Sequence, residues 1–181
     1  PLPRRLAAGV NGDDARGCNN LGVLGTTGEA NSIGLHERIE ALQGLIERGI
    51  PAAKMMPGTG VSALTDTVVL TKHAADMGCR GALLLPPFYY KNPTDDGLFA
   101  YFSEVINRVG GRIKYYLYNF PQQSAVPFSV ELIGRLLKAF PPGVQISRVP
   151  LEVAIERVGQ RLAAQPSRAA SSGQFLLLLL L

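Results

Sequence analysis

Gly25-Thr26-Thr27-Gly28-Glu29 is the stretch that decides the fold of this chain, together with Tyr118-Asn119-Phe120-Pro121 about ninety residues later. Each stretch begins where a short apolar run ends and a loop begins. In parallel α/β proteins, the loops that follow the strands carry the binding and catalytic side chains. The two stretches therefore predict a parallel sheet with a functional site at the carboxyl ends of its strands.

Short apolar runs bounded by Gly or Pro recur at intervals of about thirty residues, which is the length of one βα unit. The predicted strands are Leu21–Leu24, Pro51–Met56, Gly81–Leu85 and Ile113–Tyr118. The repeat favours an incomplete (β/α)8 TIM barrel with about strands 2 to 5 present, although a doubly wound open sheet fits the periodicity nearly as well. A complete barrel needs about 250 residues. With 181 residues, roughly a third of it is expected to be missing.

Between the predicted strands the apolar period changes to that of amphipathic helices. Three helical faces stand out, at residues 35–46, 98–106 and 130–140. Thr94, followed by two aspartates, predicts a helix N-terminus, and Ser32 and Ser62 are candidate caps of the two earlier helices. The glycines at 17, 49 and 78 are placed like helix C-terminal stops.

The charge of the chain does not indicate a polyanionic partner. The net charge is +4, but residues 21–144 hold eleven Lys and Arg against ten Asp and Glu. No basic stripe interleaved with aromatic residues is present there, so we expect no nucleic-acid binding. The apolar run from Phe175 to Leu181 is too short to span a bilayer, so no membrane association is expected. Cys18 and Cys79 follow no metal or redox spacing, which favours reduced thiols in a cytoplasmic protein.

The first stretch offers two hydroxyls and several backbone N–H groups at a strand exit, where its glycines permit close approach of a ligand. Such a nest suits a carboxylate or a phosphate. An ordinary tight βα turn explains the residues equally well. In the second stretch, Tyr116, Tyr118 and Phe120 alternate and so share one face, which is the interior of a barrel.

Together these motifs resemble the pyruvate-dependent aldolase family of dihydrodipicolinate synthase and N-acetylneuraminate lyase, over about residues 16–143. The resemblance implies that Thr27 holds the keto-acid carboxylate, with Gly25 and Gly28 shaping the binding turn. It implies that Tyr118 shuttles protons, supported by Thr26. No metal ion or organic cofactor is implied.

The stretch at residues 86–93, Pro-Pro-Phe-Tyr-Tyr-Lys-Asn-Pro, resembles the family's loop in which a tyrosine reaches across a subunit interface. Tyr90 is our first candidate for that tyrosine and Tyr89 the second. A dimer surface without a catalytic part fits the loop equally well. The family resemblance implies a homo-oligomer, whereas the open sheet edges of a partial barrel predict self-association.

The chain departs from the family pattern in two places. The family forms a Schiff base through a lysine on the strand after the tyrosine motif, and no lysine follows Lys138 here. Lys54, predicted to lie within a strand, is the weak substitute. In addition, Gln122-Gln123-Ser124 replaces the Ser-Arg-Thr of the synthases, and loss of that arginine argues against an aspartate semialdehyde substrate and favours a sugar acid or other 2-keto acid.

The missing lysine belongs to a larger departure that begins near Val144, where the family carries Gly-Ile-Lys-Asp-Ser-Ser-Gly or similar. One choice of codons for residues 144–152 reads Ala-Asp-Ile-Lys-Gly-Ser-Ser-Gly one base earlier, so we hypothesise a change of reading frame. The expected domains are an irregular segment at 1–15, a partial aldolase barrel at 16–143 and an unrelated tail at 144–181. The expected function is a lyase acting on pyruvate or a 2-keto(-3-deoxy) sugar acid that is inactive in this chain. The alternatives are a non-catalytic carboxylate-binding or assembly module and, more weakly, a doubly wound phosphate-binding domain.

Overall fold

The computed structural model describes residues 20–26, 28–140 and 146–148. Helices and short parallel strands alternate along them, so the chain has an α/β fold. The elements are η1 (Ala30–Ser32), α2 (Leu35–Glu47), η2 (Ala52–Lys54), α3 (Leu64–Asp76), β1 (Gly81–Leu84), α4 (Asp95–Val109), β2 (Lys114–Leu117), α5 (Pro121–Ser124), α6 (Val130–Ala139) and β3 (Ile146–Arg148). No helix among the described residues is long and apolar enough to cross a bilayer.

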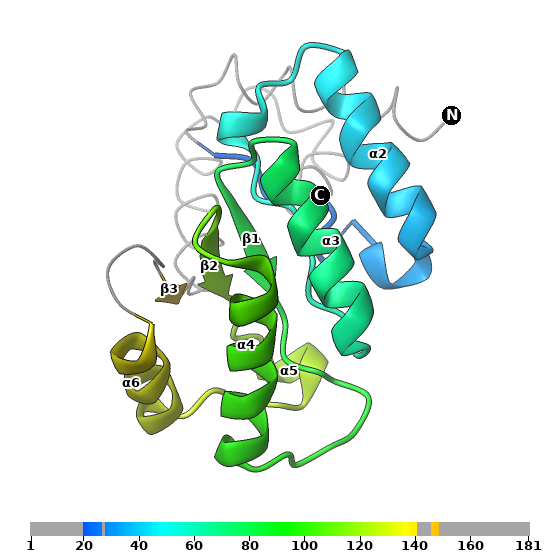
Figure 1. The fold of residues 1–181 in the computed structure, drawn as a ribbon. Coiled ribbons are helices and arrows are strands. Elements are labelled where there is room, and N and C mark those ends of the chain that lie inside the picture. The colour runs from blue at the N-terminus through cyan, green and yellow to red at the C-terminus, as the bar shows by residue number, and fades with distance from the viewer. Residues whose placement is uncertain (1–19, 27, 141–145, 149–181) are drawn as a thin grey trace, which may run out of the picture.

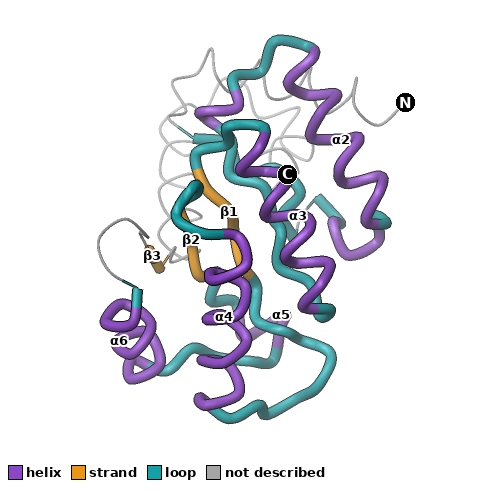
Figure 2. The backbone as a smooth tube through the Cα atoms, in the orientation of Figure 1, coloured by secondary structure: helices purple, strands orange, loops and turns teal. Residues whose placement is uncertain are grey.

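The strands lie side by side in chain order. β1, β2 and β3 form a parallel sheet in that order, with Leu83 opposite Tyr116 in the register. Two earlier segments extend the same wall through parallel bridges, Gly58 to Leu83 and Leu21 to Met55. This order contains no reversal of the kind that defines a doubly wound sheet, so it is consistent with part of a barrel wall. Figure 2 shows β1 and β2 side by side.

The helices cover one face of this wall. The long helices pack against one another in chain order: α2 against α3, α3 against α4, and α4 against α6 (Figure 1). Strand residues that contribute to the core between sheet and helices are Ala82, Leu84, Tyr115 and Leu117, all at most 1% exposed. Leu83 and Tyr116 alternate with them and are half-buried, as expected for the opposite face of the sheet.

Three details of the sequence prediction are wrong. Residues 21–24 form no strand, and only Leu21 makes a parallel bridge, to Met55. Residues 51–56 do not form a strand, because η2 occupies Ala52–Lys54 and sheet contacts begin only at Met55. Ser32 and Ser62 do not cap helices. Gly34 precedes α2, with its N–H donating to Glu37 Oε2 at 2.9 Å, and Ala63 precedes α3.

Other local predictions are confirmed. The Thr94 hydroxyl accepts the N–H of Gly97 at 3.1 Å and caps α4. Gly49 and Gly78 follow α2 and α3 with φ of 87° and 75°, values that favour glycine. Cys79 is buried and makes no disulfide. Outside the described residues lie Thr27, Gly17, Cys18, the segment 1–15 and all of the predicted tail except 146–148.

Candidate active site

A pocket opens at the carboxyl ends of the parallel segments. Its walls include Gly25 and Thr26 from the first segment, and Gly58 and Gly60 from the second. Leu83 and Leu85 come from β1 and the residue after it, and Tyr118 follows β2 directly. The two sequence motifs therefore meet in one pocket, as the loops after neighbouring parallel strands do in barrels.

Tyr118 is held firmly at the pocket wall. Its N–H donates to Leu84 O at 2.8 Å, which continues the β1–β2 pairing by one residue. The residue is 7% exposed, and the ring lies 5.9 Å from that of Phe120. Asn119 turns away and accepts the N–H of Phe128 at 3.2 Å. This bond fastens the loop after β2 to the chain that leads into α6.

The Thr26 hydroxyl is the polar group that acts on Tyr118. Burial raises the pKa of Tyr118, and Thr26 lowers it by hydrogen bonding. Yet Thr26 Oγ1 is buried and has no partner in full hydrogen-bond geometry among the described residues. The two hydroxyls are therefore adjacent, in a contact looser than a formed hydrogen bond. A buried hydroxyl without a full partner is available to a ligand.

The turn that carries Thr26 is strained at both ends. Leu24 and Glu29 adopt φ of 55° and 53°, which non-glycine residues rarely do. Inside the turn, the N–H of Glu29 donates to Thr26 O at 3.1 Å and that of Ala30 to Gly25 O at 3.3 Å. Gly28 is buried in the turn but does not line the pocket. Such strain persists only where the surroundings hold it in place.

The floor of the pocket depends on two glycines. A Cβ on Gly58 would lie 2.1 Å from Leu24 O, and a Cβ on Gly60 would lie 2.2 Å from Leu85 N. The backbone of this loop therefore touches both neighbouring strand ends, which only glycine permits. Sequence reasoning missed this role of Gly58 and Gly60.

A buried hydroxyl network ties the same loop to the helices. Thr71 Oγ1 donates to Thr59 Oγ1 at 2.9 Å, and Thr67 Oγ1 lies 2.8 Å from the Tyr101 hydroxyl, which donates to Val61 O at 2.9 Å. The three threonines are at most 2% exposed. The i, i+4 spacing of Thr67 and Thr71 within the apolar face of α3 was a signal for it.

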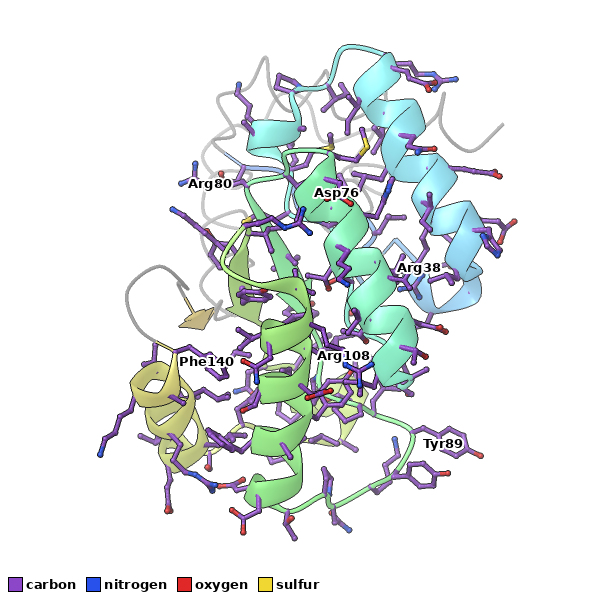
Figure 3. All side chains as sticks on the ribbon, viewed as in Figure 1. Arg38, Asp76, Arg80, Tyr89, Arg108 and Phe140 are labelled. Carbon is purple, nitrogen blue, oxygen red and sulfur yellow. The ribbon has the colours of Figure 1, made fainter. Side chains whose placement is uncertain are left out.

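Arg38 is a second site residue that sequence reasoning missed. It lies on α2, is only 4% exposed and lines the pocket. Its Nε donates to Ile33 O at 3.1 Å, and its Nη2 donates to Ala30 O and to Asn31 Oδ1. The sequence does carry a signal for it, because Arg38 stands between Leu35 and Leu42 on the apolar face of the helix. A charged side chain on a buried face almost always has polar partners. Figure 3 labels it on α2.

Other candidate residues lie elsewhere. Tyr89 and Tyr90 are 72% and 79% exposed, and Tyr89 extends away from the molecule in Figure 3. Their rings pack edge to face at 5.1 Å. Lys54 ends η2, and its carbonyl pairs with the start of the first segment, at the opposite ends of the strands from Tyr118. The prediction that Lys54 lies inside a strand is therefore wrong. Gln122 and Gln123 are exposed on α5.

Several buried groups make the stability of the fold sensitive to high pH. Burial raises the pKa of Tyr101 and Tyr115 to about 12 and that of Cys79 to about 11. As pH rises, the unfolded chain loses these protons before the folded chain does. In the unfolded chain the pKa is about 8.5 for a thiol and about 10 for a phenol. The free energy of unfolding is thus expected to fall as pH rises above about 9. Urea denaturation at pH 7, 9 and 10.5 measures this, and equal stability at all three values would contradict it.

No group of three His, Cys, Asp or Glu side chains in the described part of the chain is placed to hold a metal ion. The residues with polar side chains that line the pocket are instead Thr26, Asn31, Arg38 and Tyr118. Two hydroxyls beside a buried cation suit recognition of a small anion such as a carboxylate.

Comparison with known proteins agrees with this geometry. Residues 10–146 match the model of the Dihydrodipicolinate synthetase family. An uncharacterized DapA-like lyase of Chloroflexus aurantiacus is 38% identical over 122 residues, which are 67% of this chain and 40% of the relative. The chain thus spans about two fifths of the length of such relatives.

Solved structures give the same relationship. Dihydrodipicolinate synthase from Agrobacterium tumefaciens is similar with a TM-score of 0.76 and 37% identity, over 80% of this chain and 51% of that one. The synthase from Acinetobacter baumannii, solved with pyruvate, is similar with a TM-score of 0.69 and 30% identity, over 81% and 49% of the two chains. This chain belongs to the dihydrodipicolinate synthetase family.

Proposed function

We propose that the pocket binds the carboxylate of pyruvate or of a 2-keto(-3-deoxy) sugar acid, as the keto-acid end of an aldolase-type lyase site. The observation that carries this is the meeting of Thr26 and Tyr118 in one pocket, with the Thr26 hydroxyl lacking a full partner. Thr27, Gly25 and Gly28 complete the binding turn in this proposal. The synthase of similar fold from Acinetobacter baumannii was solved with pyruvate, which supports the choice of ligand.

In an intact lyase of this kind, the proposed chemistry is imine formation between a lysine amine and the keto carbon. The residue at the position of Tyr118 would relay the protons. Burial raises the pKa of the phenol, and the neighbouring Thr26 hydroxyl lowers it. A group that relays protons must lie within hydrogen-bond reach of the proton it transfers. No lysine lines the described pocket, and the sequence holds none after Lys138. We therefore propose that this chain binds the keto acid without forming the imine and is inactive as a lyase.

Pyruvate titration followed by NMR tests the binding. Thr26→Val removes the hydroxyl while keeping the side-chain shape, and we expect it to weaken pyruvate binding about fivefold, the value of one hydrogen bond. Thr65→Val, on the exposed side of α3, is the matched control and should leave binding unchanged. Equal affinity of the wild type and Thr26→Val would show that the Thr26 hydroxyl does not bind pyruvate.

Borohydride reduction in the presence of pyruvate tests the missing imine. A reduced imine is a stable covalent adduct that mass spectrometry detects on the intact chain. We expect no adduct. An adduct would show that a lysine of this chain reacts, and peptide mapping would identify it.

A change of reading frame near residue 144 is the proposed cause of the missing lysine. In the alternative frame the lysine codon overlaps codons 147 and 148, which encode residues of β3. There Ser147 pairs with Tyr116 and Arg148 with Leu117, so a lysine would stand beside the strand that leads to Tyr118. DNA sequencing of the locus decides the point. An uninterrupted frame that encodes Gln145 to Arg148 would end the hypothesis.

The alternative is a non-catalytic carboxylate-binding or assembly module, which the lysine-free pocket favours. Pyruvate binding without a borohydride adduct agrees with both an inactivated lyase and this module, and the locus sequence separates them. In either case we propose that Tyr90 serves an interface between copies of the chain, because it is 79% exposed and packs on the exposed Tyr89 ring. Tyr90→Ala should then lower the apparent mass in light scattering.

A further inference from the structure

Arg38 carries a buried positive charge that no acid neutralises within the part of the chain that the structure describes. The residue is 4% exposed, and burial lowers the pKa of its guanidinium, which nevertheless stays protonated. The ion pairs found among the described residues involve other arginines at the surface. Burying an ion without a counter-ion is energetically unfavourable. Such an ion therefore persists where its hydrogen bonds stabilise a conformation that the fold requires.

The partners of Arg38 all belong to one short segment. Its guanidinium donates to Ala30 O and to Asn31 Oδ1, and its Nε donates to Ile33 O at 3.1 Å. That segment begins immediately after the strained Glu29 and ends just before α2. The planar guanidinium fork fits several acceptors at once, which a lysine ammonium does not.

The same segment fixes the turn that carries Thr26. The N–H of Ala30 donates to Gly25 O at 3.3 Å, and Ala30 O accepts from Arg38. Arg38, Ala30 and Gly25 are therefore linked in series, and all three line the pocket. A strained turn keeps its conformation only when its surroundings restrain it, and Arg38 is the charged restraint here.

We propose that Arg38 is a positioning residue, whose buried guanidinium holds residues 25, 26 and 28–30 of the turn in the shape that receives the carboxylate of the ligand. The identity of the ligand rests on the proposed function, whereas the effect on the turn does not. The guanidinium acts through the turn and also places a weakly screened positive charge at the pocket wall. The pocket is then expected to prefer an anionic ligand to its neutral ester.

The first test needs no ligand. Amide hydrogen exchange measured by NMR reports opening of the turn at the N–H groups of Glu29 and Ala30. Arg38→Met, which removes the charge and the donors, should speed exchange at both groups at least about tenfold. Arg38→Lys should speed it less, and serves if the methionine variant does not fold. Arg48→Met is the matched control, since Arg48 is exposed at the end of the same helix, where its Nη1 donates to Gly44 O.

Unchanged exchange in Arg38→Met and Arg38→Lys overturns the inference. So does equal acceleration in Arg48→Met, because the effect would then belong to the helix as a whole. Faster exchange confined to the turn in the Arg38 variants supports it.

The second test compares pyruvate with methyl pyruvate. Arg38→Met should weaken pyruvate binding about tenfold and leave the neutral ester nearly unaffected, a split that general loosening of the fold would not produce. Parallel loss of both ligands, or no loss of either, contradicts the proposed role. If the wild type binds no pyruvate, the proposed function fails, and the exchange experiment still decides whether Arg38 holds the turn.

Discussion

Replacing Phe102 with alanine is expected to lower the free energy of unfolding by about 3–5 kcal/mol, the usual cost of emptying a buried aromatic site. Phe102 lies at the centre of α4 and is fully buried. Its ring packs 5.3 Å from that of Phe128, which precedes α6, and so joins two helices of the outer layer. Since small domains have only about 5–15 kcal/mol of stability in total, the variant should be marginally folded at best.

Urea denaturation followed by circular dichroism measures the effect. Phe99→Ala is the matched control, because Phe99 lies one turn earlier on α4 and is half-buried, with the Arg135 guanidinium 4.6 Å above its ring. We expect it to cost clearly less than Phe102→Ala. Equal costs would show that Phe102 is not packed in the core as its burial indicates.

The sequence predicted those features that depend on neighbouring residues. The Thr94 cap and the apolar period of α4 are local signals, and the structure confirms both. The meeting of Thr26 and Tyr118 also followed from local signals, because the carboxyl ends of parallel strands share one edge of a sheet. Knowing where each strand ends was therefore enough to bring two distant motifs together.

Features that depend on contacts between distant segments were not predictable. η2 stands where the start of a strand was expected. The backbone of Leu21 bonds to Lys54 O and to the N–H of Met56, so contacts with the sheet begin only after η2. The partner of Arg38 is a turn whose strained shape no local pattern encodes. The spacing of Thr67 and Thr71 indicates buried hydroxyls on one face of α3, but it does not identify Thr59, in a separate loop, as a partner.

Replacing Gly58 with alanine is expected to reduce pyruvate binding by more than about tenfold and to lower the free energy of unfolding by about 1–3 kcal/mol, as overpacking does. The added Cβ would lie 2.1 Å from Leu24 O and 3.0 Å from Leu24 C. Neither atom can move away by rotation of a side chain, since both belong to the backbone. Leu24 directly precedes the turn that carries Thr26, so the clash displaces the carboxylate site itself.

Gly134→Ala separates this effect from the general effect of adding a methyl group. Gly134 lies within α6, and its added Cβ meets nothing within 4 Å, so the change should stabilise the helix by up to about 1 kcal/mol. Pyruvate titration and urea denaturation of both variants measure the difference. Gly58→Ala should weaken binding and lower stability, whereas the same added methyl group in Gly134→Ala should leave binding unchanged and raise stability. If Gly58→Ala kept wild-type affinity, the contact between its loop and Leu24 would have no part in binding. The turn would then owe its shape to Arg38 and to its own hydrogen bonds alone.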